Sequence, residues 1–182
     1  IQISEWLHQL IEQEGNNNSL FSLIEIGPGE GNLSFDLITS IIEIAPDLIH
    51  KIEMVMVEPN IGMALRQKKL MKKLGDINIR WSSLEELSKS PSVGIIIAHE
   101  VLDALPVQRF TFINGKLYRK GVGLDKSNSD SKLIIHNIDP SKEMIEFISI
   151  ANDSLGIKLP PEELVEPWCS EYHSSLSNWF SE

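Results

Sequence analysis

The feature that most constrains the fold is an apolar run that passes directly into a glycine-rich turn and then into a helical pattern. Residues 20–26 (LFSLIEI) are typical of a buried strand, and Gly27-Pro28-Gly29 ends it. In the segment that follows, apolar residues recur at helical spacing until Pro46. A strand, a tight turn and a helix in this order form the repeating unit of a parallel sheet whose strands are joined by helices.

The same alternation continues through the first hundred residues. The run 93–98 (VGIIIA) is apolar on both faces, which is typical of a parallel strand covered by helices on both sides. We therefore predict an α/β fold with a doubly wound, mostly parallel sheet. The remaining expected elements are helices at residues 1–14 and from the Asn60 cap to Leu74, strands at 54–57 and 77–81, and a short helix after the latter.

The second half of the chain has a different character. Two strand-like runs at 107–113 and 116–122 flank Asn114-Gly115, which is the strongest short signal for a β-hairpin. A polar loop is expected at 125–132. We expect one domain over residues 1–182, with a hairpin and insertion at 107–167 inside it.

Two further elements are expected near the C-terminal end. Asp139-Pro140 suggests a helix start, with Asp139 as the cap and Pro140 at the first helical position. An aromatic and apolar stripe at helical spacing predicts a core-packed helix; its members are Trp168, Tyr172, Leu176 and Trp179.

Composition excludes several classes of site. With 26 acidic and 16 basic residues the net charge is −10, which argues against a nucleic-acid-binding surface. The basic run 66–73 (RQKKLMKK) is read as the solvated face of a helix. Cys169 is the only cysteine, so an intrachain disulfide and a cysteine metal cluster are excluded. No group of residues has the spacing of metal ligands.

The sequence also bears on localisation. Its longest apolar runs are too short to span a bilayer, so we expect no membrane insertion. No targeting segment is visible, although the chain begins with Ile1 rather than Met. We expect a cytoplasmic protein if the source is bacterial, and a mitochondrial matrix protein if it is eukaryotic.

The glycine loop predicts a nucleotide-like ligand. Gly27, Gly29 and Gly31 let the backbone turn and a ligand approach closely, and the following helix offers free N–H groups at its positive end. A dinucleotide fingerprint has its third glycine where this chain has Asn32. Glu25, two residues before the first glycine, suits a ligand with a cationic amine. The spacing resembles motif I of the class I S-adenosylmethionine-dependent methyltransferases.

Glu58 ends the second strand, and Pro59 holds its backbone extended. A carboxylate at this position can accept hydrogen bonds from both hydroxyls of a ribose. Because adenosylmethionine and NAD both contain such a ribose, Glu58 supports nucleoside binding without separating the two cofactors.

The turn after the third strand is the expected adenine contact. In the methyltransferase class this turn touches the adenine, so Ser83 and Leu84 are candidates. Alternatively, Ser82 or Ser83 forms a helical capping box with Glu85 or Glu86, and the two readings are compatible.

The segment after the fourth strand, AHEVLDALP, carries the candidate acceptor residues. If residues 100–105 form a helical turn, Glu100 and Asp103 lie on one face. Two carboxylates there suit a cationic acceptor such as a guanidinium group, which carboxylates bind in a bidentate fork. Asp103 could instead brace the following segment. His99 could line the pocket, accept a proton, or simply be a strand-end histidine.

Together these stretches resemble the MidA-type methyltransferases, whose mitochondrial relatives serve as assembly factors for respiratory complex I. The resemblance covers roughly residues 6–179 and is carried by "EIGPGEGNL", "VEPN", "AHEVLDALPVQRF" and "PPEELVEPW". It implies a class I, Rossmann-like methyltransferase fold, adenosylmethionine as the cofactor and, for the mitochondrial branch, methylation of a protein arginine. The residues that it implies at the cofactor are Glu25, Gly27, Pro28, Gly29, Gly31, Asn32, Glu58, Pro59, Asn60, Ser83 and Leu84.

The chain departs from the family pattern in three ways. The family usually has Asn at the position of His99 and a basic residue at the position of Glu30. Its members are also longer at both ends, so we expect a fragment whose sheet is incomplete towards the C-terminus.

Three functional hypotheses remain open on the sequence. The first is a methyltransferase acting on a protein, with His99, Glu100 and Asp103 facing the acceptor. The second is a nicotinamide-dependent oxidoreductase, which Asn32 and Glu25 disfavour. The third is a non-catalytic assembly or scaffold module of the same fold.

Overall fold

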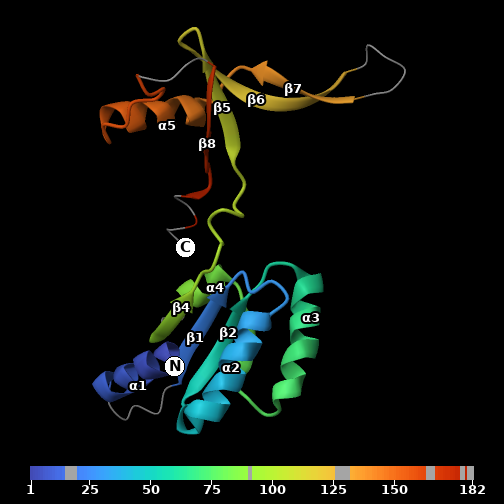
Figure 1. The fold of residues 1–182 in the computed structure, drawn as a ribbon, viewed down its shortest axis with the longest axis vertical. Coiled ribbons are helices and arrows are strands. Elements are labelled where there is room, and N and C mark those ends of the chain that lie inside the picture. Colours follow the sequence, from blue (N-terminus) through green and yellow to red (C-terminus); the bar gives the residue numbers. More distant parts are fainter. Residues whose placement is uncertain (15–19, 90–91, 126–131, 163–166, 177–178, 180–182) are drawn as a thin grey trace. The chain divides into compact units, whose positions relative to one another are not determined.

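The first part of the chain is a parallel sheet. A computed structural model describes residues 1–14, 20–89, 92–125, 132–162, 167–176 and 179, and the chain divides into two compact units, Ile1–Asp103 and Ala104–Ser181. In the first unit every strand pair is parallel and the strand order is β3-β2-β1-β4. These strands are β1 (Phe21–Ile26), β2 (Ile52–Val57), β3 (Ile79–Ser82) and β4 (Gly94–Ile97). Figure 1 labels β1, β2 and β4 of this sheet.

Helices connect these strands as the sequence pattern predicts. Apolar residues of α1, α2 and α3 pack against one shared core with the sheet. Among the described residues, no helix combines the length and the apolar character that a bilayer span requires. The helices of this unit are α1 (Gln2–Glu14), α2 (Asn32–Ile44), α3 (Ile61–Met71) and α4 (Leu84–Ser88), with short 3-10 turns at Pro46–Leu48 and Lys72–Leu74.

The alternation of side chains along β1 divides the unit into two cores. Phe21 and Leu23 face the core formed with α1, α2 and α3. Ile24 faces the other side, where Leu84 and Leu87 of α4 pack. Because Glu25 is two residues after Leu23, strand periodicity places it on the side of α2.

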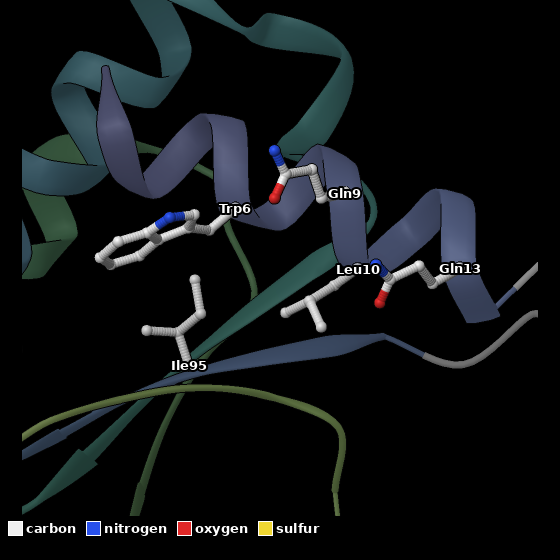
Figure 2. Close-up of a pocket in the computed structure, with 5 residues that line it drawn as sticks. All are labelled: Trp6, Gln9, Leu10, Gln13 and Ile95. Atoms are coloured by element: carbon white, nitrogen blue, oxygen red, sulfur yellow. The ribbon is translucent and has the colours of Figure 1, made fainter.

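β4 differs from its prediction. We expected both of its faces to be covered, yet Ile96 is 64 % exposed. The reason is that β4 is the edge strand in the described sheet, paired only with β1, and on this side α4 packs over residues of the neighbouring strands β1 and β2. Its other face does pack: Figure 2 shows Trp6 and Leu10 of α1 pointing toward Ile95, around a pocket of about 250 Å³ that Gln9 and Gln13 also line.

Predicted caps define two helix starts. The side chain of Asn60 accepts a hydrogen bond from the Met63 N–H at 3.1 Å, which confirms it as the cap of α3. Ser83 and Glu86 form the capping box of α4, with both reciprocal hydrogen bonds present. Ser83 directly follows β3, and Asn60 lies three residues after the end of β2, so both caps fix the backbone at that edge of the sheet.

In the part of the chain that the structure describes, the second unit contains an antiparallel sheet that packs with the helix α5. The sheet has the order β7-β6-β5-β8. The predicted hairpin is confirmed, because Asn114 and Gly115 both have positive φ and join β5 to β6. Phe110 and Phe112 pack with Met144 and Ile148 of the helix. The elements are β5 (Gln108–Ile113), β6 (Lys116–Asp125), β7 (Lys132–Ile138), α5 (Lys142–Asp153) and β8 (Trp168–Tyr172).

Two predictions in this half were wrong in detail. Trp168 and Tyr172 lie in a strand, because a spacing of four residues also equals two strand periods. They do pack in the core, as expected. The cap of α5 is Ser141 rather than Asp139, since the Ser141 hydroxyl accepts the Met144 N–H at 3.2 Å. The polar loop expected at 125–132 lies, between its two end residues, outside the described residues.

A polar triad ties the three strands β1, β2 and β3 together. The Arg80 guanidinium group donates to both oxygens of Glu53, at 2.9 and 3.1 Å, and the Ser22 hydroxyl donates to Glu53 at 2.9 Å. The hydrogen bond from Arg80, with a smaller contribution from Ser22, holds the pKa of Glu53 below its ordinary value of 4.5. Since unfolding frees this carboxylate, its lowered pKa stabilises the folded state above pH 4.5, and the stabilisation is lost as the pH falls through the lowered pKa.

We therefore predict that Glu53→Gln lowers the free energy of unfolding at pH 7 by about 0.5–1 kcal/mol, because Arg80 is partly screened by solvent. The difference from wild type should shrink as the pH is lowered below 4.5. Urea unfolding at several pH values measures both effects. Glu171→Gln is the matched control, since its ion pair with Arg109 is more than half exposed on both sides. A difference that persists unchanged at low pH would contradict the assignment.

Candidate functional site

The carboxyl ends of the four parallel strands meet at one edge of the sheet. Ile26, Val57, Ser82 and Ile97 are the last residues of β1, β2, β3 and β4. Parallel pairing in register brings the loops that follow them to the same edge. With Glu25 one residue before a strand end, every candidate site residue lies at this edge of the first unit.

The three glycines of the first loop all have positive φ, but they meet different surroundings. Gly27, Gly29 and Gly31 have φ of 68°, 55° and 86°. A methyl group at Gly31 would lie 3.2 Å from both Gln67 and Met56, and one at Gly27 would lie 3.3 Å from Val101. At Gly29 a methyl group would meet nothing within 4 Å. Gly31 and Gly27 thus leave room for neighbouring side chains, whereas Gly29 borders open space.

Glu25 lies beneath this loop. Its side chain is 4 % exposed, and one of its oxygens accepts a hydrogen bond from the Ser34 hydroxyl in the first turn of α2. Ser34 is itself buried. The carboxylate therefore joins the end of β1 to the start of α2 and braces the glycine loop from below.

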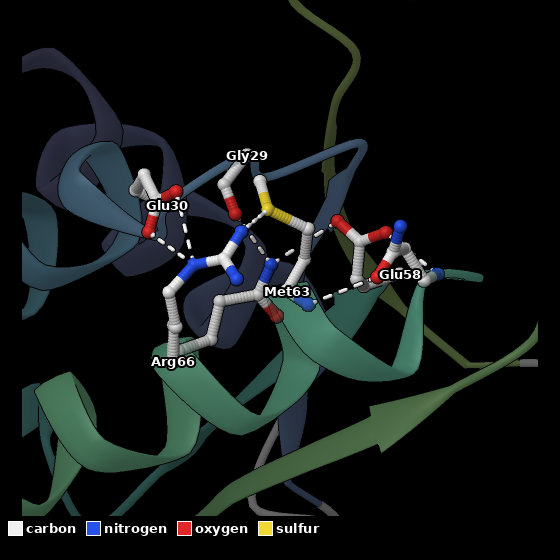
Figure 3. Close-up of polar contacts among 7 residues, drawn as sticks. Gly29, Glu30, Glu58, Met63 and Arg66 are labelled. Carbon is white, nitrogen blue, oxygen red and sulfur yellow. Dashed lines mark hydrogen bonds and ion pairs between the residues drawn. The ribbon is translucent and has the colours of Figure 1, made fainter.

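Glu58 is held by two protein donors. The Asn60 N–H donates to one oxygen at 2.8 Å, and the Gln67 side-chain amide donates to the other at 3.1 Å (Figure 3). A carboxylate has about four acceptor positions. Two therefore remain after these contacts, which equals the number of hydroxyl groups on a ribose edge.

Gln67 is the residue that sequence reasoning missed. It lies within the basic run 66–73, which was read as a solvated helix face, but its side chain is fully buried. The available signal was its spacing, because Met63, Gln67 and Met71 recur every four residues on one side of α3. Met71 is also buried, so this side of the helix faces the sheet.

Glu30, where the resemblance predicts a basic residue, is paired. The Arg66 Nε donates to both of its oxygens, at 3.0 and 3.1 Å. Figure 3 shows the Arg66 guanidinium group between Glu30 and Met63, whose sulfur it also contacts. Both members of the ion pair are more than half exposed, so the pair is screened by solvent.

Ser83 and Leu84 follow β3 as expected. The backbone N–H of Ser83, followed by the Ser82 hydroxyl, lowers the pKa of Glu86 below its ordinary value. Ser83 therefore caps α4, as the structural alternative required, while Leu84 is half-buried against the core beneath α4. The capping does not test whether Ser83 and Leu84 contact an adenine, so that contact stays a prediction.

The segment after β4 is not the helical turn that we expected. Residues 99–105 form bends and a turn, and Glu100 has φ of 51°, in the left-handed region. Helix is disfavoured there because Leu105 precedes Pro106. His99, Glu100 and Asp103 are exposed, and none of them is hydrogen-bonded or ion-paired to a described residue. The Val101 side chain lies close to Gly27, because a methyl group at Gly27 would be 3.3 Å from Val101 Cγ2.

Comparisons with known proteins identify the cofactor class. A family model described as "Putative S-adenosyl-L-methionine-dependent methyltransferase" matches residues 2–182. A comparison with curated proteins finds no match. The family match favours the methyltransferase hypothesis over the nicotinamide-dependent one and confirms the predicted cofactor, S-adenosylmethionine.

Two crystal structures of proteins from Burkholderia thailandensis are similar in fold. One is a native structure, with 18 % identity and a TM-score of 0.64, covering 95 % of this chain and 42 % of that one. The other is bound to S-adenosyl-homocysteine, with 18 % identity and a TM-score of 0.62, covering 95 % and 40 %. This chain thus spans about two-fifths of the length of either. The likeness confirms the predicted α/β, class I methyltransferase fold, and the family match shows that the chain belongs to the S-adenosyl-L-methionine-dependent methyltransferase family.

Proposed function

We propose that this chain binds S-adenosylmethionine across the carboxyl edge of its parallel sheet, as the cofactor-binding part of a methyltransferase that acts on a protein. The observation that carries the proposal is the pairing of two features at one edge. Gly29 borders open space, and Glu58 keeps two acceptor positions beside it. A ligand with a ribose and an amino-acid end could place its ribose against Glu58 and its amino-acid end beside Gly29.

The two ends of the cofactor would meet different loops. Glu58 would accept the ribose hydroxyls, with Pro59 and Asn60 fixing its backbone, and Ser83 and Leu84 would contact the adenine. At the other end, Gly27, Pro28, Gly29 and Gly31 would surround the methionine part, with Glu25 supporting them from beneath. Free N–H groups at the start of α2, from Asn32 onward, would suit the methionine carboxylate.

The acceptor would approach over the segment after β4. Bound adenosylmethionine supplies an electrophilic methyl group on a sulfonium, so the protein mainly has to align the acceptor atom with it. Glu100 and Asp103 are exposed carboxylates without a described partner, and such groups orient an arginine guanidinium through charge-assisted hydrogen bonds. His99 would accept a proton. The resemblance to MidA-type proteins supports a protein arginine as the acceptor and, in a mitochondrial relative, a role in complex I assembly.

The cofactor assignment is tested by calorimetry with S-adenosylhomocysteine on the whole protein. We predict that Glu58→Ala weakens binding by about ten- to a hundredfold, because two charge-assisted hydrogen bonds to the ribose are lost. Glu12→Ala, at an exposed position of α1, is the control and should bind like wild type. Absence of binding to wild type, or equal binding of NAD and S-adenosylhomocysteine, would refute the assignment.

The glycine loop gives a second prediction that separates packing from ligand access. Gly31→Ala should lower the free energy of unfolding by about 1–3 kcal/mol, because it adds strain at positive φ and crowds Gln67 and Met56. Gly29→Ala should cost only the strain, about 1 kcal/mol, but should block cofactor binding. Urea unfolding and calorimetry measure the two effects. A Gly29→Ala protein that binds with wild-type affinity would show that the ligand does not approach there.

The acceptor assignment is tested with adenosylmethionine labelled in the methyl group and an extract of the source cells. Glu100→Gln and Asp103→Asn should each reduce label incorporation at least about tenfold, while affinity for S-adenosylhomocysteine stays within about twofold. Mass spectrometry of the labelled protein then identifies the acceptor atom. Binding without any incorporation by wild type would favour the scaffold hypothesis, and label on another residue type would exclude arginine.

A further inference from the structure

One buried amide contacts three of the strand-end segments that form the proposed site. The Gln67 Nε2 donates to the Gly29 carbonyl at 2.6 Å and to a Glu58 oxygen at 3.1 Å. Its Oε1 accepts a hydrogen bond from the Trp81 indole N–H at 2.8 Å. Gln67 thus joins the loop after β1, the end of β2 and β3 through a side chain that is 0 % exposed.

The chemistry of the three partners fixes the orientation of the amide. A carbonyl and a carboxylate only accept hydrogen bonds, and an indole N–H only donates. Gln67 therefore has to turn its NH₂ group toward Gly29 and Glu58 and its oxygen toward Trp81. With both N–H groups and the oxygen in use, the buried amide has no unsatisfied group.

The third glycine of the loop makes room for this side chain. A methyl group at Gly31 would lie 3.2 Å from the Gln67 Cγ, closer than ordinary side-chain contacts. Gly31 is also the residue before α2, with φ of 86°. A larger residue at position 31 would therefore crowd the Gln67 side chain, so Gln67 can occupy this place only while position 31 is glycine.

These contacts fix the orientation of two groups that the cofactor would meet, the Gly29–Glu30 peptide and the Glu58 carboxylate. In a trans peptide the carbonyl and the following N–H point in opposite directions, so holding the Gly29 carbonyl toward α3 turns the Glu30 N–H away from α3. The second contact fixes one Glu58 oxygen. A single side chain thus sets both the orientation of the glycine loop and the orientation of the proposed ribose acceptor.

We propose that Gln67 is a positioning residue that holds the glycine loop and the Glu58 carboxylate in register for the two ends of adenosylmethionine. The inference rests on the proposed cofactor site. No other side chain offers two donors and one acceptor at this length: glutamate replaces the donors with acceptors, lysine and arginine offer no acceptor, and methionine offers no donor and only a weak sulfur acceptor.

The decisive variant is Gln67→Glu in the whole protein. It keeps the shape and the acceptor for Trp81, but it places an acceptor against the Gly29 carbonyl and the Glu58 carboxylate. We expect affinity for S-adenosylhomocysteine to fall at least about tenfold in calorimetry, because charged repulsion replaces two hydrogen bonds. The nuclear magnetic resonance signal of the Trp81 indole N–H should stay in its hydrogen-bonded position. Gln13→Glu, at an exposed position of α1, adds the same charge and should not change affinity.

Two further variants separate positioning from simple structural support. Gln67→Met keeps the length, removes both donors and leaves only a weak sulfur acceptor for Trp81. Its affinity should also fall at least about tenfold, and the Trp81 signal should move. In the double variant Gln67→Glu/Glu58→Ala the combined loss should be clearly smaller than the product of the single losses, because Gln67 acts partly through Glu58. If Gln67→Glu does not fold, as judged by circular dichroism, Gln67→Met decides.

Affinity within twofold of wild type in a folded Gln67→Glu or Gln67→Met variant would overturn the inference, as would fully multiplicative losses with Glu58→Ala. These outcomes leave the cofactor site intact, since wild type would still bind and Glu58→Ala would still bind more weakly than wild type. If wild type itself fails to bind S-adenosylhomocysteine, the proposed cofactor site and the inference about Gln67 are both refuted.

Discussion

The parallel pairing of β1 with β2 and β4 is the constraint on which the rest of the first unit depends. Because these strands run the same way, Gly27, Glu58 and His99 follow strand ends at a common edge although they are far apart in sequence. The crossover helices that parallel pairing requires then supply the helix start and the buried face that support the loops. In an antiparallel arrangement successive loops would lie at opposite edges of the sheet, and the candidate site residues would not come together.

Two buried polar residues connect this topology to the local geometry of the loops. Glu25 fixes the first turn of α2 through Ser34. Gln67 fixes Gly29 and Glu58 from α3. Both side chains lie on the same side of the sheet, where apolar packing excludes water, and burial makes their hydrogen bonds costly to break. The glycine loop and Glu58 are thus held by side chains that are buried beside the apolar core.

Sequence patterns predicted the strands and caps of the first unit and the hairpin of the second because the signals for these elements are local. Strand runs, the caps Asn60 and Ser83, and the hairpin at Asn114-Gly115 each depend on a few neighbouring residues. The failures arose where a local pattern has two meanings. The interval between Trp168 and Tyr172 fits a helix and a strand equally, and the burial of Gln67 depends on contacts with distant loops. The exposure of Ile96 follows from which strands pair, a property that no window of sequence contains.

The acidic Glu30 illustrates how such long-range contacts change the meaning of a departure from a family pattern. Taken alone, an acid in the loop would repel the carboxylate of the methionine end. Arg66 faces it from α3, one residue before Gln67, so the same helix neutralises the loop with its outer side and anchors it with its inner side. The exposed ion pair contributes at most about 1 kcal/mol to stability, so its main effect is on charge at the proposed site. Exchanging a base for an acid at position 30 therefore does not by itself argue against binding of the cofactor.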